Sequence, residues 1–310
     1  MTTKPFRFFA ALGLCLCVFY SPTRAQDDAS DAPLTFRSTV DVVTIQASVR
    51  DGRGRVVGGL RPADFEVRDN GQLRPILSLR SDRLSPLSLA ILVDMSGSMR
   101  SKIGFARQAY AAVLSQLRQE QDEVALFTFD SSLHERHDFT RDLSSLRDAL
   151  EDFETFGRTS LYDATAGAAR RLAERTATRK AIIVLTDGID TSSTMTAREV
   201  SSVASSIDVP VFVVATVPSY EQRLIMETSL RSSPSKEADL RDLADWTGGH
   251  LLFASTLVET VAGAASLIDE LRQQYVLAIE AASGPEWRRL DVRVRRPSTI
   301  VKARSGYFAG

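Results

Sequence analysis

The chain has 310 residues, which is enough for one large domain and a smaller one. Hydrophobic residues make up 44% of it and charged residues 25%, a balance typical of a globular protein with a folded core. Lys and Arg number 38 against 39 Asp and Glu, and this near-neutral charge argues against a general nucleic-acid binder or a basic protein of membrane surfaces.

Residues 1–25 have the order of a secretory signal peptide. Lys4 and Arg7 precede an apolar run over residues 8–20, and Thr23-Arg24-Ala25 follows as a small-residue cleavage site. The run is too short for a comfortable membrane anchor, and no later apolar stretch approaches spanning length. Both cysteines lie in this run, so the mature protein would lack disulfides and thiolate metal ligands. We expect an exported protein, periplasmic or secreted, without a membrane span in the mature chain.

Residues 26–35 form a polar lead-in that we expect to be flexible, and residues 36–85 are expected to form a small β module. Hydrophobic residues alternate along its strands. Asp51-Gly52 and Asn70-Gly71 supply the turns typical of hairpins. The pattern predicts about four strands.

Residues 86–274 alternate between apolar strands and helical segments. Strands are predicted near residues 87–94, 122–130, 180–187, 209–217 and 250–254. Helices are predicted near residues 100–119, 142–152, 160–176, 197–206, 237–246 and 257–274. Capping boxes, Thr196-x-x-Glu199 and Thr256-x-x-Glu259, mark two of the helix starts. This alternation predicts an α/β fold with a doubly wound, mostly parallel sheet covered on both faces.

Residues 275–310 return to short alternating strands separated by turns. Three strands alone would be marginally stable, so we expect this segment to pair with the N-terminal β module. The chain would therefore leave the β module, build the α/β domain and return.

Oxygen-bearing side chains occur at the ends of two predicted strands and before one predicted helix. Asp94, Ser96 and Ser98 follow the strand at 87–94, Asp187 ends the strand at 180–187, and Thr159 precedes the helix at 160–176. If the two strands are neighbours, these five residues meet at the carboxyl edge of the sheet, where α/β folds bind ligands. Hard oxygen donors suit Mg²⁺ or Mn²⁺. The sequence therefore predicts a metal site, although Asp-Ser-Gly-Ser could also be an ordinary turn.

The order D-x-S-x-S, then T, then D resembles the metal-ion-dependent adhesion site (MIDAS) of von Willebrand factor A (VWFA) domains. The resemblance covers about residues 87–275, and the flanking β segments are similar to those of exported bacterial proteins with a VWFA-related domain. It implies a Rossmann-like fold. It also implies that the hydroxyls of Ser96, Ser98 and Thr159 contact the metal, and that Asp94 and Asp187 contact it directly or through water. Gly157-Arg158-Thr159 departs from the Gly-Gly-Thr that is commoner in the family.

These features favour an exported, non-enzymatic adhesion module. Its cation would bind an Asp or Glu side chain of a protein partner, and no nucleic acid is expected. One alternative is a metal-dependent hydrolase or phosphatase that uses Asp94 or Ser96. It is disfavoured because no Gly-x-Ser-x-Gly elbow surrounds Ser96, and because that position lacks the second aspartate of a known phosphatase class. A structural scaffold with a non-functional site is the other alternative.

Other conspicuous residues are expected to have structural roles. Asp163 suits the first turn of the helix at 160–176, and Asp190 is expected in a solvated loop. Trp246 and Trp287 are expected to be core or packing residues. Most arginines between residues 288 and 296 are expected on a solvated strand face.

Overall fold

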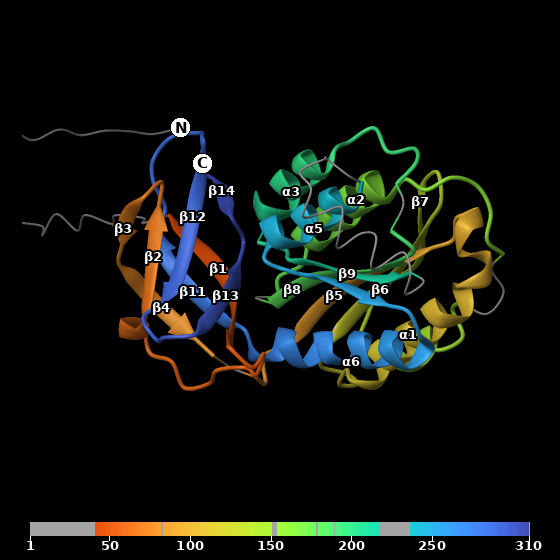
Figure 1. The fold of residues 1–310 in the computed structure, drawn as a ribbon, viewed down its shortest axis with the longest axis horizontal. Coiled ribbons are helices and arrows are strands. Elements are labelled where there is room, and N and C mark those ends of the chain that lie inside the picture. Colours follow the sequence, from red (N-terminus) through yellow and green to blue (C-terminus); the bar gives the residue numbers. More distant parts are fainter. Residues whose placement is uncertain are drawn as a thin grey trace, which may run out of the picture. The chain divides into compact units, whose positions relative to one another are not determined.

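Figure 1 shows the computed structural model of the chain. It describes residues 41–81, 83–150, 154–177, 179–188, 190–206, 208–217 and 236–309. The predicted signal peptide and polar lead-in lie outside the described residues. The chain from Val40 onward forms one structural unit.

A six-stranded sheet in the order β10-β9-β8-β5-β6-β7 forms the centre of the α/β part. Neighbouring strands pair in parallel except β7, which runs antiparallel to β6 at one edge. Every residue of β5 is buried, because helices cover both faces of the sheet. The strands are β5 (Leu87–Asp94), β6 (Glu123–Phe129), β7 (Leu133–Thr140), β8 (Arg179–Thr186), β9 (Val211–Thr216) and β10 (Leu251–Ala254).

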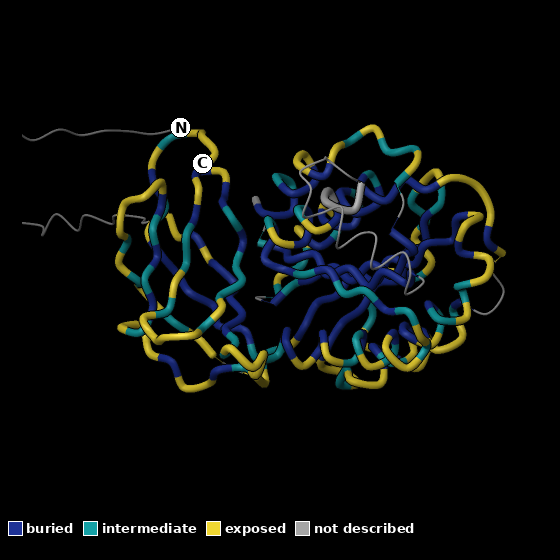
Figure 2. Tube along the Cα trace, viewed as in Figure 1, coloured by how far each residue is buried: buried dark blue, intermediate teal, exposed yellow. Residues whose placement is uncertain are grey.

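Two helix layers sandwich this sheet (Figure 1). Helices α1 (Ile103–Ser115) and α6 (Leu257–Gln273) pack on the face that carries Leu89 and Ile91. Helices α2 (Leu161–Ala173), α3 (Ala197–Ser206) and α5 (Lys236–Thr247) pack on the face that carries Ala90 and Leu92. The central strands β5, β6, β8 and β9 are almost wholly buried, whereas the outer helix faces are exposed (Figure 2). No helix within the described ranges is both long and apolar enough to cross a membrane.

The structure differs from the sequence-based prediction of the α/β part in two places. The helix predicted over 142–152 is only a 3-10 turn, η3 (Leu143–Leu146), and residues 147–150 are turns. Local bonds from serine side chains to Asp142 compete with helix formation there. The strand β7 was not predicted, because its polar sequence at the sheet edge lacks the apolar residues that mark buried strands.

The strands from both ends of the chain form two four-stranded antiparallel sheets, ordered β13-β1-β11-β4 and β14-β12-β2-β3. Apolar residues from both sheets share one core. The fold class, an α/β domain with a small β module built from both chain ends, is therefore confirmed, whereas the exact domain limits stay a prediction. The strands are β1 (Val42–Asp51), β2 (Phe65–Asp69), β3 (Gln72–Arg74), β4 (Ile76–Arg80), β11 (Tyr275–Glu280), β12 (Trp287–Val294), β13 (Thr299–Ala303) and β14 (Gly306–Phe308).

Buried polar contacts join the β module to the α/β part. Glu270 of α6 accepts hydrogen bonds from Ser48 (2.8 Å) and Arg50 (2.6 Å) of β1, and His250 Nδ1 lies 3.4 Å from it. Burial alone would raise the pKa of Glu270, but the contacts with His250 and Arg50 outweigh burial and lower it to about 2. The carboxylate is therefore charged and paired at this junction.

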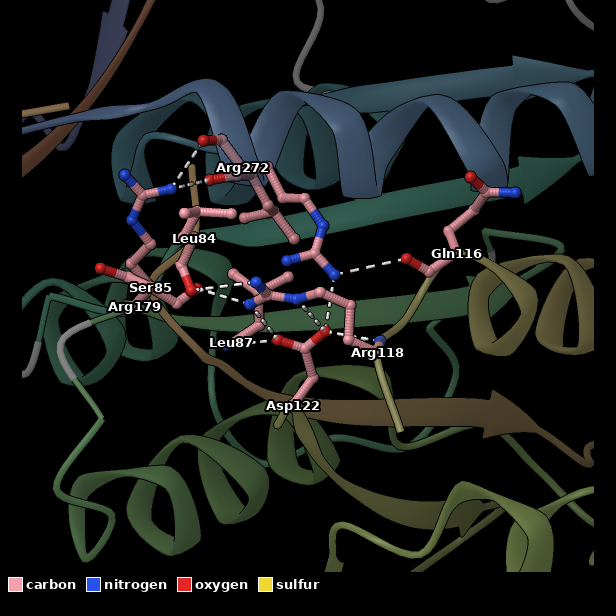
Figure 3. A network of polar contacts seen from close by, with 9 residues as sticks. Leu84, Ser85, Leu87, Gln116, Arg118, Asp122, Arg179 and Arg272 are labelled. Carbon is pink, nitrogen blue, oxygen red and sulfur yellow. Dashed lines mark hydrogen bonds and ion pairs between the residues drawn. The ribbon is translucent and has the colours of Figure 1, made fainter. Parts of the chain in front are cut away.

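A second buried network lies at the amino ends of the parallel strands (Figure 3). The fully buried Asp122 carboxylate accepts hydrogen bonds from Arg118 Nη2 (3.0 Å), Arg272 Nη2 (2.6 Å) and Leu87 N (3.0 Å). Burial alone would raise the pKa of Asp122, but the two arginines outweigh burial and lower it to about 2. The network ties the start of β5 to the ends of α1 and α6.

The helix α6 begins with the predicted capping box, in which Thr256 Oγ1 accepts from Glu259 N at 3.2 Å and Glu259 Oε2 accepts from Thr256 N at 3.3 Å. We expect Thr256→Ala to lower the free energy of unfolding by about 1 kcal/mol, because an amide at the helix start loses its acceptor. Urea denaturation measures the change. The control Ser266→Ala, at an exposed position of α6, should leave stability within about 0.5 kcal/mol of the wild type. Equal stability of the Thr256 variant and the wild type would contradict the prediction.

Candidate metal site

The strands β5 and β8 are parallel neighbours, as the predicted site requires. Val93 pairs with Leu185, so Asp94 and Asp187 lie at adjacent strand ends on the carboxyl edge of the sheet. Thr186 Oγ1 donates to Asp94 Oδ2 at 2.6 Å, which joins the two strand ends directly. Both aspartates are buried.

The turn after β5 presents the two serines of the motif. Ser96 N donates to Asp94 Oδ1 at 2.8 Å, and the hydroxyl oxygens of Ser96 and Ser98 lie 3.1 Å apart. The short helix η2 (Gly97–Ser101) begins in this turn. Asp94 thus stabilises the turn, as a purely structural interpretation requires, and also holds Ser96 and Ser98 at the sheet edge.

The loop that carries Thr159 is held against this turn. Gly97 N donates to the carbonyl oxygen of Gly157 at 3.1 Å, and the positive φ of Gly157, +82°, favours glycine there. On the other side, Thr159 N donates to Thr191 Oγ1 at 3.0 Å. Arg158, the departure from the commoner family pattern, donates through Nη2 to the carbonyl oxygen of Thr191. Thr159 is therefore fixed and buried between two loops.

Two further acidic residues hold the loop at 190–196. Asp190 Oδ2 accepts from Ser193 Oγ (2.5 Å) and Tyr162 N (3.2 Å), so the half-buried Asp190 also has a structural role that was not expected. Asp163 accepts from Thr194 N at 2.9 Å and has the expected structural role. Both contacts attach the loop to the start of α2 and thereby support Thr159.

The electrostatics of the site suit a cation. Burial raises the pKa of Asp94, hydrogen bonds from Thr186 and Ser96 offset part of this shift, and the charge of Asp187 adds to it, so that the resulting pKa is about 6. Asp187 Oδ1 is buried and has no hydrogen-bond partner, and Oδ2 lies 3.4 Å from Lys102 Nζ. Two buried carboxylates with an unsatisfied oxygen are costly unless a positive ion compensates them.

Sequence reasoning missed Thr186 and Lys102. Thr186 stands next to a predicted ligand but was treated only as strand, and Lys102 gave no signal beyond being a single basic residue after the serine turn. Within the described ranges, no group of three or more His, Cys, Asp or Glu side chains is placed to hold a metal. The structure puts Asp94, Ser96 and Ser98 on one turn, Asp187 on the adjacent strand end and Thr159 on the neighbouring loop. Metal ligation by these residues stays a prediction.

This arrangement of sheet, helices and strand-end loops is similar to that of a known protein family. Residues 89–189 match the family model described as the von Willebrand factor type A domain. Over these residues the chain is similar to a VWFA domain. The family resemblance inferred from the D-x-S-x-S, T and D motifs is thus confirmed, as is the doubly wound fold. No curated protein matches the chain.

Solved structures with TM-scores just above 0.5 show a similar fold at low sequence identity. A von Willebrand factor type A protein from Catenulispora acidiphila matches 88% of this chain and 75% of its own, with 13% identity and a TM-score of 0.51. Proximal thread matrix protein 1 from the mussel byssus, solved with a zinc-occupied MIDAS motif, matches 66% of this chain and 49% of its own, with 12% identity and a TM-score of 0.51. The protein BatB from Bacteroides thetaiotaomicron matches 60% of this chain and 98% of its own, with 17% identity and a TM-score of 0.47.

Proposed function

We propose that this chain is an exported, non-enzymatic binding module whose VWFA domain uses Mg²⁺ or Mn²⁺ to bind an Asp or Glu side chain of a protein partner. The unpartnered, buried Oδ1 of Asp187, beside the buried Asp94 carboxylate, carries the proposal. A bound divalent ion would supply an electrophilic site for the partner's carboxylate.

The chain's own residues would divide the work of holding the ion. Asp94 and Asp187 would balance its double charge. Ser96, Ser98 and Thr159 would add neutral hydroxyl oxygens, which leave the ion attractive to a further carboxylate. These five residues are of the types that make up a MIDAS motif. Proximal thread matrix protein 1 holds zinc in such a motif.

Export is proposed from residues 1–25, which have the charged, apolar and small-residue order of a signal peptide. A periplasmic or secreted protein would meet divalent cations and protein partners outside the cytoplasm. These residues lie outside the described part of the chain.

A hydrolase that uses Ser96 is not supported by the contacts of that residue. A serine nucleophile needs a neighbouring base, and the Ser96 hydroxyl pairs with that of Ser98. Each of the three histidines has its contacts elsewhere: His134 with Ser132, His137 with Ser145 and His250 with Glu270. We therefore favour binding over catalysis.

The metal site is tested by thermal unfolding with Mg²⁺ or with EDTA. An ion at 100 times its dissociation constant should stabilise the wild type by about 2.7 kcal/mol. Asp187→Ala should remove this gain, because one of the two charged donors is lost. Thr159→Ala should reduce it and leave the fold intact, because a neutral donor is lost. Asp138→Ala, at a side chain of β7 that is 66% exposed, is the control and should keep the full gain.

Calorimetric titration and a pull-down complete the test. Unchanged Mg²⁺ binding in the Asp187 and Thr159 variants would show that the ligand assignment is wrong. A pull-down from the native envelope fraction should recover a partner with Mg²⁺ that EDTA releases and that the Asp187 variant fails to retain. Metal binding without any EDTA-sensitive partner would instead favour the structural scaffold.

A further inference from the structure

A groove of ≈ 810 Å³ lies where the β module meets α3 and the end of α5. Its walls come from separate parts of the chain, since Trp287 and Phe308 belong to β12 and β14 whereas Arg198 belongs to α3. Ser305 N donates to the carbonyl oxygen of Trp246 at 2.8 Å and joins the walls. A groove of this size, with walls held by main-chain contacts, is within the range of ligand-binding clefts.

One wall of the groove is aromatic and open to solvent. Trp287 and Phe308 are cross-strand partners whose ring centroids lie 6.4 Å apart, and their side chains are 38% and 55% exposed. Trp287 is therefore a packing residue at the surface and not a core residue. Its indole lies against Gly306, where an added Cβ would stand 2.5 Å from Trp287 Cζ2. The ring is thus exposed but held in place, which lowers the entropic cost of a contact.

The groove also has an excess of positive charge. Arg198 and Arg289 line it and are exposed, and the structure shows no ion pair between either of them and another described residue. In contrast, two other arginines of β12 are paired, Arg288 with Asp69 and Arg293 with Asp291.

With two arginines and one glutamate, the described lining residues keep a net charge of +1. Glu199 accepts hydrogen bonds from Thr196 N (2.8 Å) and Thr196 Oγ1 (3.0 Å) in the capping box of α3. Its carboxylate is thus engaged at the start of its own helix. Both guanidinium groups remain available to an acidic ligand.

We propose that this groove binds a peptide segment of a protein partner in which carboxylates flank an aromatic or large aliphatic side chain. The apolar side chain would pack on Trp287 and Phe308, and the carboxylates would pair with Arg198 and Arg289, whose planar guanidinium groups suit bidentate contacts. Tryptophan and arginine are the residue types that contribute most to protein interfaces. The proposal does not depend on the metal site.

The test uses the full chain and a random dodecapeptide library displayed on phage, with EDTA throughout. Peptides selected on the wild type should be enriched in Asp and Glu next to an aromatic or aliphatic residue. A selected peptide, synthesised with a fluorescent label, should bind Trp287→Ala and Arg289→Glu at least tenfold more weakly than the wild type by anisotropy. Arg293→Glu, which reverses a 67% exposed arginine of the same strand, is the matched control and should bind like the wild type.

Charge exchange makes the test specific. The same peptide with its acidic residues changed to lysine should lose binding to the wild type and regain it on Arg289→Glu. The proposal is overturned if no peptide is selected, if selected peptides lack acidic residues, or if Arg289→Glu and Arg293→Glu bind alike. Because EDTA is present, failure of the proposed metal site leaves every one of these outcomes unchanged.

Discussion

Replacing Asp122 by alanine should lower the free energy of unfolding by about 3–5 kcal/mol, the usual cost of removing one partner from a buried ion pair. The change would leave two arginines, Arg118 and Arg272, without the carboxylate that neutralises them at the amino ends of the strands (Figure 3). It would also leave the buried amide of Leu87 without its acceptor. Urea denaturation at pH 7 measures the loss.

The pH dependence gives this prediction a second readout. The pKa of Asp122 is about 2 in the folded protein, below the 3.8 of an unperturbed aspartate. Its contribution to stability is therefore present above about pH 4 and lost as the pH falls through about 2. The gap in stability between the wild type and the alanine variant should therefore narrow over that window. Asp291→Ala, which removes a solvent-exposed pair with Arg293, is the control and should cost less than about 1 kcal/mol. A loss for Asp122→Ala no larger than for this control would contradict the role of the network.

The elements that the sequence predicts best are those with a local physical cause. The apolar run at 87–94 predicts a buried strand, because its side chains have to leave water. The capping box of Thr256 and Glu259 predicts a helix start, because the two side chains satisfy the first amides of the helix. The edge strand β7 escaped prediction because it is polar and pairs only with β6. Its partner, not its composition, makes it a strand.

The sequence predicts which residues of the candidate site lie at the same sheet edge, but not the contacts that hold them there. Parallel strands bring Asp94 and Asp187 to one edge as soon as β5 and β8 are neighbours, so spacing and strand ends were sufficient. Two contacts depend on the paths of loops far apart in the chain: the ion pair of Lys102 with Asp187, and the hydrogen bond from Thr159 N to Thr191 Oγ1. Such paths leave no periodic signal.

The exposed position of Trp287 in the groove follows from the alternation of residues along β12. In β12 the burial alternates, with Arg288 and Leu290 inside and Trp287 and Arg289 outside. Leu290, an apolar core residue of a strand with period two, already fixes the side on which each neighbour must lie. Residue type left open whether Trp287 is a core or a surface packing residue, and the register of the strand decides for the surface.

The two ends of the central sheet differ in how they treat buried charge. At the amino end, the oxygens of Asp122 accept from two arginines and two main-chain amides. At the carboxyl edge, Asp187 Oδ1 has no partner and the pKa of Asp94 is raised. The first arrangement stabilises the fold. The second lowers the free energy of unfolding, and binding of a cation would offset this loss.

The variant Asp94→Asn should therefore make the metal-free protein more stable. The pKa of Asp94 rises from the 3.8 of an unperturbed aspartate to about 6, so the ionised carboxylate costs the folded state up to about 3 kcal/mol at neutral pH. Asparagine keeps a side-chain oxygen for Ser96 N and carries no charge. Urea denaturation in EDTA at pH 7.5 should show the gain, while added Mg²⁺ should stabilise the wild type and leave the variant unchanged.

The sign of the pH dependence separates this cost from a change in packing. Because the folded pKa of Asp94 is raised, its ionisation destabilises the metal-free wild type above about pH 6, and the penalty disappears as the pH falls towards about 4. The advantage of Asp94→Asn in EDTA should shrink accordingly between pH 7.5 and pH 4.5. Asp138→Asn, which removes an exposed charge of β7, should show no advantage at either pH. An Asp94→Asn variant less stable than the wild type in EDTA at pH 7.5 would mean that the buried carboxylate is already compensated by the protein, and the case for a cation at this edge would fail with it.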